Sequence, residues 1–188
     1  MNVSEYIWQF LADQGVTHCY FLAGGGSMFL IDALARQDRI TPVAMLHEQS
    51  CAIASVGHNI YTNTLSSVVC VTTGPGGTNA ITGVAAGWID EVPMFIISGQ
   101  VPTHMMMESN KKGIVRYGST YPKGWDERQK GPQEVAITNI VRPITKASPI
   151  VNQVKGGWKL EDLWRIANEH PRGPVWMDIP LDVQSASI

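Results

Sequence analysis

One acidic residue, Glu48, stands where an apolar stretch gives way to a run of small residues, in the sequence MLHEQSCAIASVGH. A carboxyl group that follows a buried strand and is walled by apolar residues would have a raised pKa. Such a group can exchange a proton with a heterocyclic nitrogen near neutral pH, which is general acid–base chemistry. The alternative is structural, because a glutamate in the first turn of a helix interacts favourably with the helix dipole.

Two glycine-rich segments flank this glutamate, GGGS from Gly24 onward and GPGGTN from Gly74 to Asn79. Glycine removes the side chain where a backbone must closely approach a flat or anionic group, and the Asn79 amide can supply a hydrogen bond. A dinucleotide fingerprint is disfavoured, because the third glycine of G-x-G-x-x-G is missing and no acidic residue ends the second strand. The second segment lacks the G-K-[ST] of a phosphate-binding loop. Tight strand-to-helix turns are the structural alternative for both segments.

Length and composition narrow the class of protein. The chain has 188 residues and a formal net charge of −2, which suits one domain with its own core and offers no basic patch for nucleic acid. No apolar run approaches the length of a transmembrane helix, and the N-terminus has no signal-peptide pattern. Three cysteines without paired spacing fit reduced core thiols, and the histidines lack metal-binding spacing. We therefore expect a cytoplasmic protein without membrane, nucleic-acid or metal-binding sites of its own.

Apolar runs and helical periodicities alternate along the chain. The runs predict strands at residues 18–23, 42–46, 67–72, 92–98, 140–146 and 174–179, and the periodicities predict helices at residues 3–13, 27–36, 48–61, 80–88 and 160–169. Strands that are apolar throughout and alternate with helices indicate an α/β fold, a doubly wound parallel sheet with helices on both faces. Residues 1–188 would form a single domain with a long loop at about residues 101–133. The glycine segments and Glu48 would lie at the carboxyl edge of the sheet, where such folds bind ligands.

Four stretches resemble one enzyme family in the same order: MLHEQSCAIASVGHNIY, VVCVTTGPGGTNAITGVAAGWIDEVPMFIISGQVPT, VRPITKAS and GPVWMDIPLDVQ. They are similar to the N-terminal pyrimidine-binding domain of thiamine diphosphate enzymes, and within these to the acetolactate synthase group. The resemblance covers residues 6–184, nearly the whole chain. It implies the pyrimidine-binding type of the thiamine diphosphate-binding fold, with thiamine diphosphate and Mg²⁺ as cofactors.

The resemblance also implies roles for individual residues. Glu48 matches the family glutamate that bonds a ring nitrogen of the cofactor's aminopyrimidine and starts the proton exchange that activates the thiazolium carbon. Gln133 matches a catalytic-site glutamine on the substrate side, with an ordinary loop residue as the alternative, whereas Gln100 is expected to be structural. The cofactor-binding positions implied in the same way are Gly24, Gly25, Gly26, Glu48, Thr73, Pro75 and Asn79.

Departures from the family pattern lie near the expected substrate. Relatives usually have proline where this chain has Gly24, and phenylalanine where it has Pro132. The second change borders the bound carbonyl compounds, so it leaves open whether the chain takes part in acetolactate synthesis itself. Residues 103–130 are longer than the matching segment of acetolactate synthases, and would reshape substrate access or form a subunit contact.

The family's diphosphate-binding motif, GDG, does not occur in the 188 residues. The chain would hold half of an active site, and thiamine diphosphate and Mg²⁺ would need ligands from a separate diphosphate-binding subunit that carries a GDG motif. We expect a split enzyme, a heterotetramer or larger, that decarboxylates a 2-oxoacid such as pyruvate or transfers the resulting acyl unit. The alternatives are a domain excised from a longer acetolactate synthase-like enzyme and a non-catalytic regulatory binding module.

Overall fold

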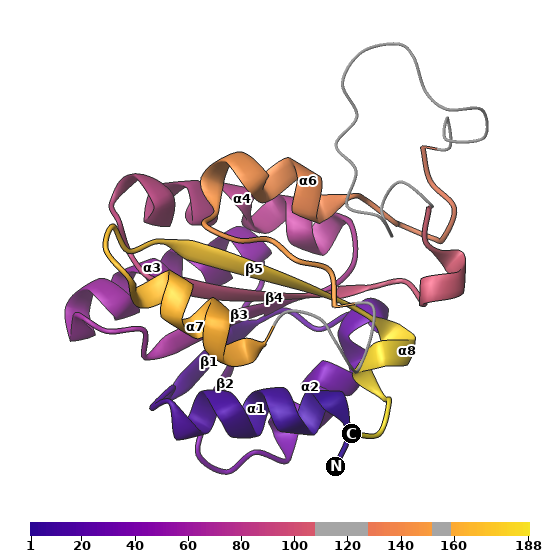
Figure 1. Ribbon diagram of the computed structural model, residues 1–188, viewed down its shortest axis with the longest axis horizontal. Helices are drawn as coiled ribbons and strands as arrows, with labels where there is room; N and C mark the ends of the chain where they lie inside the picture. Colours follow the sequence, from indigo (N-terminus) through magenta and orange to yellow (C-terminus); the bar gives the residue numbers. More distant parts are fainter. Residues whose placement is uncertain (108–127, 152–158) are drawn as a thin grey trace.

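The computed structural model of the chain describes residues 1–107, 128–151 and 159–188. Its centre is a five-stranded sheet with the order β2-β1-β3-β4-β5, in which every neighbouring pair is parallel (Figure 1). The strands are β1 (His18–Phe21), β2 (Thr41–Ala44), β3 (Ser67–Val71), β4 (Met94–Gln100) and β5 (Pro174–Pro180). The predicted α/β fold with a doubly wound parallel sheet is confirmed.

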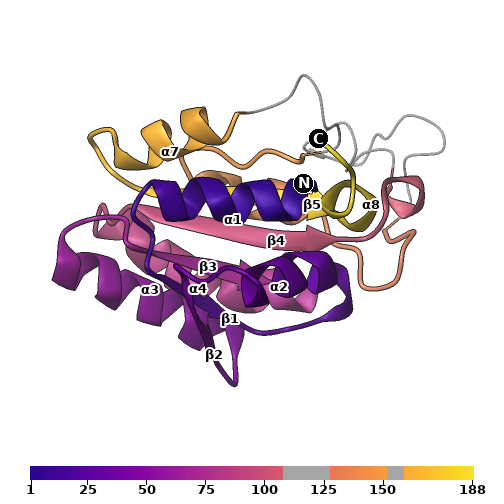
Figure 2. The same cartoon turned by 90° about the horizontal axis from the view of Figure 1, so that it is seen from below.

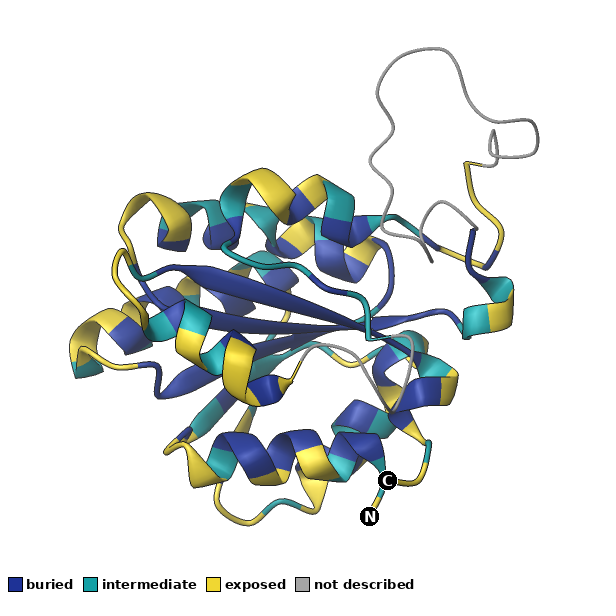
Figure 3. Ribbon diagram, in the orientation of Figure 1, coloured by how far each residue is buried: buried dark blue, intermediate teal, exposed yellow. Residues whose placement is uncertain are grey.

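Helices cover both faces of this sheet. The α1 layer contains α1 (Val3–Asp13), α2 (Met28–Ala35), α7 (Leu160–Asn168) and α8 (Leu181–Gln184), and the α3 layer contains α3 (Glu48–Thr62), α4 (Pro75–Ile89) and α6 (Ile137–Val141). Figure 2 shows α1 and α7 on one side of β4 and α3 and α4 on the other. Side chains of β4 alternate accordingly, because Phe95 and Ile97 join the core of the α1 layer whereas Met94 and Ile96 join that of the α3 layer. The central strands are therefore buried on both sides (Figure 3).

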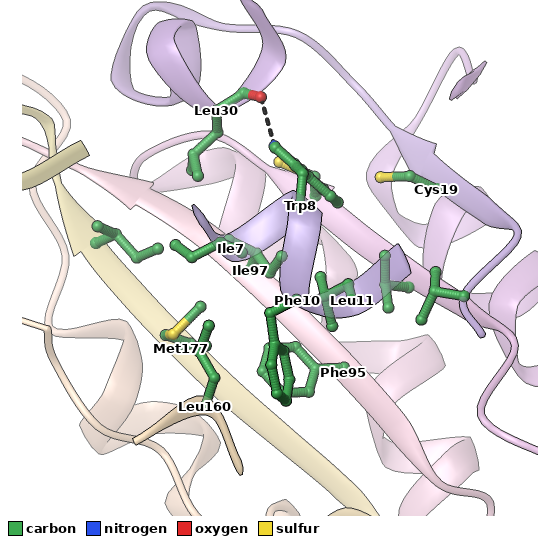
Figure 4. Packing of buried hydrophobic residues seen from close by; sticks show 14 of the residues in the cluster. Ile7, Trp8, Phe10, Leu11, Cys19, Leu30, Phe95, Ile97, Leu160 and Met177 are labelled. Carbon is green, nitrogen blue, oxygen red and sulfur yellow. Dashed lines mark hydrogen bonds between the residues drawn. The ribbon is translucent and has the colours of Figure 1, made fainter. Parts of the chain in front are cut away.

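The core of the α1 layer is apolar and is held at one point by an indole hydrogen bond. Trp8 is 1% exposed, and its Nε1 donates to the Leu30 carbonyl oxygen at 2.8 Å, which joins α1 to α2 (Figure 4). The helix begins with a capping box, in which Asn2 and Glu5 each accept the other's backbone N–H. The chain ends also meet here, since the Ile188 N–H donates to the Met1 carbonyl oxygen at 3.2 Å.

The core of the α3 layer contains a polar centre at Asn59, which is 1% exposed. The amide oxygen accepts from the backbone N–H groups of Ser66 and Ser67 and from the Ser67 hydroxyl. The amide nitrogen donates to the carbonyl oxygens of Ser67 and Pro93. One side chain of α3 thus fixes the start of β3 and the residue before β4, so α3 has a defined position against the sheet.

Two of the predicted strands differ from the structure: one is exposed instead of buried, and the other does not form. β2 is an edge strand with Thr41, Pro42 and Ala44 exposed, so the expectation of a buried strand before Glu48 is wrong. Proline is tolerated there because one side of an edge strand is unpaired. Residues 140–146 form the end of α6 and the 3-10 helix η3 (Arg142–Ile144) instead of a strand. Pro143 lacks the N–H that a strand ladder would need.

The predicted helix at residues 80–88 is longer than expected, because α4 begins at Pro75. Gly74 is the N-cap residue with φ 58°, and proline suits the first helical position, where its missing N–H costs no hydrogen bond. The GPGG sequence is thus the first turn of a helix rather than a loop. Cys19, Cys51 and Cys70 are buried thiols, in agreement with their prediction as core residues. In the described part of the chain, no helix is long and apolar enough to cross a membrane.

Candidate functional site

The carboxyl edge of the sheet brings together the segments that follow β1, β2 and β3. Chain connections leave in opposite directions on the two sides of the β1–β3 pair, and open parallel sheets bind ligands at such a switch point. The glycine segment at residues 24–26 follows β1, Glu48 follows β2, and Thr73 follows β3. Residues predicted separately from the sequence are therefore neighbours at this edge, which we call the Glu48 site.

Glu48 is the first residue of α3, and only 6% of it is exposed. His47 caps the helix, because its Nδ1 accepts a hydrogen bond from the Gln49 N–H at 3.2 Å. The unpaired N–H groups of the first helical turn favour a negative charge at this position. The cap and the helix dipole together hold an acidic side chain at the edge of the sheet.

Asn79 fixes the orientation of the Glu48 carboxyl group. Its Nδ2 donates to Glu48 Oε2 at 3.1 Å, which joins the beginnings of α3 and α4. Among the described residues, no group donates to Glu48 Oε1, so this oxygen is left for a ligand. A Cβ on Gly76 would collide with Thr72 Cγ2 at 2.8 Å and would contact Oε1 at 3.5 Å, so packing against Thr72 requires glycine here, and its lack of a side chain also leaves this side of the carboxyl free.

Gly24 and Gly26 allow the loops after β1 and β3 to touch. A Cβ on Gly24 would lie 2.5 Å from Thr72 Cγ2, and a Cβ on Gly26 would collide with Thr73 Oγ1. The Gly26 N–H also donates to Thr72 Oγ1 at 3.1 Å. A Cβ on Gly25 would meet nothing within 4 Å. Packing within the protein thus explains two of the three glycines, and their contact with a cofactor stays a prediction.

Thr73 carries a polar atom that the described part of the protein leaves unpartnered. The residue is 5% exposed, and its Oγ1 has no hydrogen-bond partner. A buried hydroxyl without a partner costs about 1–3 kcal/mol, but the protein itself covers this oxygen, which lies where a Cβ of Gly26 would be, so contact of Thr73 with a cofactor stays a prediction.

Pro75 and Gln133 lie at the exposed rim of the site. Pro75 starts α4, and its contribution within the protein is to the helix. Gln133 joins the site through its backbone, because its carbonyl oxygen occupies the space that a Cβ of Gly74 would fill. Its exposed side chain makes no direct contact with Glu48 that the structure describes, so its position relative to a substrate stays a prediction.

Sequence reasoning missed two residues of the site's framework. Thr72 accepts the Gly26 N–H, and Glu134 accepts the backbone N–H groups of Met107 and Gly131, which precede Gln133 in the chain. The signals for them were weak. Thr72 continues a β-branched strand, and a glutamate in a polar loop is ordinary. Their importance depends on contacts between segments far apart in the chain.

The Glu48 site suits proton exchange with a flat heterocyclic ligand. It offers a buried carboxyl with one open oxygen and, at Gly76 beside it, a backbone surface without a side chain. Its residues include no cation that would hold a diphosphate. Across residues 1–107, 128–151 and 159–188, no three His, Cys, Asp or Glu side chains group closely enough to hold a metal ion.

Comparison with known proteins agrees with this chemistry. A profile of the family described as thiamine pyrophosphate enzyme, N-terminal TPP binding domain, matches residues 1–130. The acetolactate synthase large subunit of Buchnera aphidicola subsp. Acyrthosiphon pisum is 32% identical over 191 residues, covering 97% of this chain and 28% of the relative. The isozyme 1 large subunit of Escherichia coli is 32% identical over 184 residues, covering 97% and 29%. A chloroplastic acetolactate synthase of Nicotiana tabacum is 31% identical over 182 residues, covering 96% and 24%. The chain thus spans less than a third of the length of these relatives.

Proposed function

Because the chain belongs to the thiamine pyrophosphate enzyme family, through its N-terminal TPP-binding domain, we propose that the Glu48 site binds the pyrimidine ring of thiamine diphosphate. The reaction served is decarboxylation of a 2-oxoacid such as pyruvate, or transfer of the acyl unit that remains. The observation that carries the proposal is the buried Glu48 carboxyl, fixed at Oε2 by Asn79. The cofactor, when bound, supplies the nucleophilic carbon and the electron sink for loss of carbon dioxide.

The chain's own residues bind the ring and move one proton. Glu48 Oε1 would exchange a proton with a ring nitrogen, which is the general acid–base role of a positioned carboxyl. Thr73 would line the pocket of the ring, and Gly76 would leave room for the ring beside the carboxyl. Gln133, on the rim, would contact the substrate.

The proposal includes a partner that holds the diphosphate through Mg²⁺ and a GDG motif. The outer surface of α3 and α4 supports it, because Ile53, Ile60, Tyr61 and Ile89 are exposed there and Glu48 is the only charged side chain of the two helices. Both helices begin at the Glu48 site, whereas Ile60, Tyr61 and Ile89 lie at their far ends, so a partner that also meets the other end of the cofactor would have to extend along the length of α3 and α4. We propose a separate subunit in a heterotetramer or larger assembly, with a further domain of a longer polypeptide as the alternative.

The experiment is an assay of the complete enzyme, that is, the chain co-expressed with its GDG-bearing partner or the longer polypeptide. Carbon dioxide release from pyruvate and other 2-oxoacids is measured with thiamine diphosphate and Mg²⁺. Glu48→Gln keeps the shape of the side chain and removes its proton exchange, so kcat should fall about a hundredfold or more. Glu161→Gln, the same change at an exposed position of α7, is the matched control and should leave kcat unchanged.

Two results would contradict the proposal. If no 2-oxoacid is turned over and Glu48→Gln leaves the Kd for thiamine diphosphate unchanged, the chain is a non-catalytic binding module. If the assembled enzyme has a mass that matches this chain alone, as measured by light scattering while activity persists, the partner is unnecessary.

A further inference from the structure

Gln133 has a backbone conformation that is uncommon for a residue with a side chain, with φ 60°. Such conformations persist where surrounding contacts determine them, and they cluster at functional sites. The first of these contacts is Gly74, which itself has φ 58°. Because Gly74 lacks a Cβ, the Gln133 carbonyl oxygen can occupy that space. The backbones of the two residues therefore pack directly against each other, so the position of Gln133 depends on the turn that carries Thr73.

Glu134, the next residue, also fixes the backbone conformation of Gln133, through hydrogen bonds of its side chain. It is 2% exposed, and its Oε1 accepts the Met107 N–H at 2.7 Å. Its Oε2 accepts the N–H groups of Lys130 at 3.2 Å and Gly131 at 3.3 Å. One buried carboxylate therefore joins Met107, 27 positions earlier in the chain, to the turn that precedes Gln133.

The residue after Glu134 is fixed to the sheet. Gln100 Nε2 donates to the Val135 carbonyl oxygen at 3.2 Å and to Asp178 Oδ2 at 2.9 Å. Asp178 Oδ1 accepts from Ser98 Oγ at 2.6 Å, so the amide of Gln100 is held by both β4 and β5. Gln133 thus lies between two anchored points, one made by Glu134 and the other by Gln100.

We propose that Glu134 is a positioning residue for the reaction, whose carboxylate fixes the turn at residues 131–135 and thereby places Gln133 at the rim of the Glu48 site. This inference rests on the proposed function, because Gln133 matters to the reaction only if a substrate binds there. Gln100 has a supporting part, since it holds the far side of the same turn. Glu48 and Asn79 lie on other segments, so loss of the Glu134 contacts should leave the hydrogen bond between them, and with it the orientation of the Glu48 carboxyl, intact.

The test uses Glu134→Gln in the complete enzyme. The substitution keeps the shape of the side chain and replaces one acceptor oxygen with a donor. We expect amide hydrogen exchange at Met107, Lys130 and Gly131 to become at least about tenfold faster, because these N–H groups lose a charged acceptor. We also expect kcat/KM for the 2-oxoacid to fall at least about tenfold, with the Kd for thiamine diphosphate in the presence of Mg²⁺ unchanged. Glu161→Gln should alter none of these values.

A double-mutant cycle separates positioning from general stability. If Glu134 acts through Gln133, the double variant Gln133→Ala/Glu134→Gln should be no slower than Gln133→Ala alone. Additive losses, or unchanged amide exchange in Glu134→Gln, would overturn the proposal. Should Glu134→Gln not fold, Glu134→Asp keeps the charge with a shorter reach, and exchange at Met107 should rise by a smaller factor. Amide exchange does not require turnover. An enzyme inactive on every 2-oxoacid would therefore defeat the proposed function, whereas the exchange result would still decide whether Glu134 fixes the turn.

Discussion

The α1 layer and the α3 layer both bury apolar cores against the sheet, but they present different surfaces to the solvent. In the α1 layer and the loop after α2, Arg36, Arg39 and Arg165 each form an exposed ion pair with a carboxylate. α3 and α4 carry one charged side chain, Glu48, and it is buried. Their outer surface instead exposes apolar side chains such as Ile60, which is 55% exposed.

The contrast has a physical meaning. Exposed ion pairs contribute little to stability, so the charges of the α1 layer indicate a surface that stays in water. On α3, Ile53, Gly57 and Ile60 follow the spacing of a helix face that packs against another element. One face of the sheet therefore carries helices that expose ion pairs, and the other carries helices that expose apolar side chains, which fits the partner proposed above.

The largest expected effect lies within the α1 layer. Trp8→Ala should lower the free energy of unfolding by about 3–5 kcal/mol, because it leaves a large cavity and removes the donor to the Leu30 carbonyl. Urea denaturation followed by circular dichroism measures this loss. Since the α1 layer faces water, the loss should be the same with and without the partner. If the partner restored the lost stability, the α1 layer would also depend on the partner, and the contrast between a water-facing layer and a covered layer would be wrong.

The core of the α3 layer contains a buried acidic residue, Asp178, which should make the free energy of unfolding depend on pH. By strand alternation Asp178 points to the α3 layer, and burial there raises its pKa to about 7. Between roughly pH 4 and pH 7 the native state holds a proton that the unfolded chain has released. The free energy of unfolding should therefore fall as pH rises through this range, by up to roughly 1.4 kcal/mol per pH unit, and this group should add no further change above it.

Asp178→Asn tests this pH dependence whatever its effect on total stability. The slope of unfolding free energy against pH, from urea titrations between pH 4 and pH 8, should become flatter than that of the unaltered chain. An unchanged slope would mean that Asp178 is already ionised at low pH in the native state. In that case Asp178 would add no pH dependence to the unfolding free energy, and the two layers would not differ in this respect.

A charge placed on the apolar surface tests the contrast directly. Ile60→Glu should leave the unfolding free energy of the chain within about 0.5 kcal/mol, because the position is exposed. It should weaken association with the partner by about 2 kcal/mol, or roughly thirtyfold in Kd. Ala35→Glu adds the same charge to an exposed position of α2 and should leave the Kd unchanged. Equal effects of the two variants on association would show that the surface of α3 is not the one covered.

The smallest expected effect concerns the contact between α3 and α4. A Cβ on Gly83 would lie 2.5 Å from Ala52 Cβ, so Gly83→Ala should push the helices apart and cost about 1 kcal/mol. Gly57→Ala, on the outer side of α3, meets nothing within 4 Å and should raise helix stability by about 0.5–1 kcal/mol. Thermal unfolding of both variants gives the sign of each effect. Similar destabilisation by both would mean that close helix packing is not what requires glycine at position 83.

Local sequence patterns were sufficient to predict the helices and strands whose burial matches their apolar pattern. α1 has an apolar face and a capping box, and β5 is apolar except for Asp178 and is buried on both sides. β2, α6 and the start of α4 depended on tertiary context instead. Position at the sheet edge decides how far β2 is exposed, and the left-handed conformation of Gly74 decides where α4 begins.

The candidate site divides in the same way. Glu48 and the glycines could be singled out by residue type, because their chemistry does not depend on distant neighbours. The bond from Asn79 to Glu48 and the bond from Gly26 to Thr72 join residues 31 and 46 positions apart, and no local pattern predicts either. The orientation of the carboxyl and the reason for two glycines therefore required the fold.

The ends of the chain are paired with each other, since Asn2 and Ser187 form an antiparallel bridge. A polypeptide whose ends already touch can be joined there and opened at an exposed loop, with nearly all of its contacts preserved. In such a circular permutant, α8 would be made before α1 instead of last. A permutant that folds would show that the arrangement of the sheet does not depend on the order in which its parts leave the ribosome.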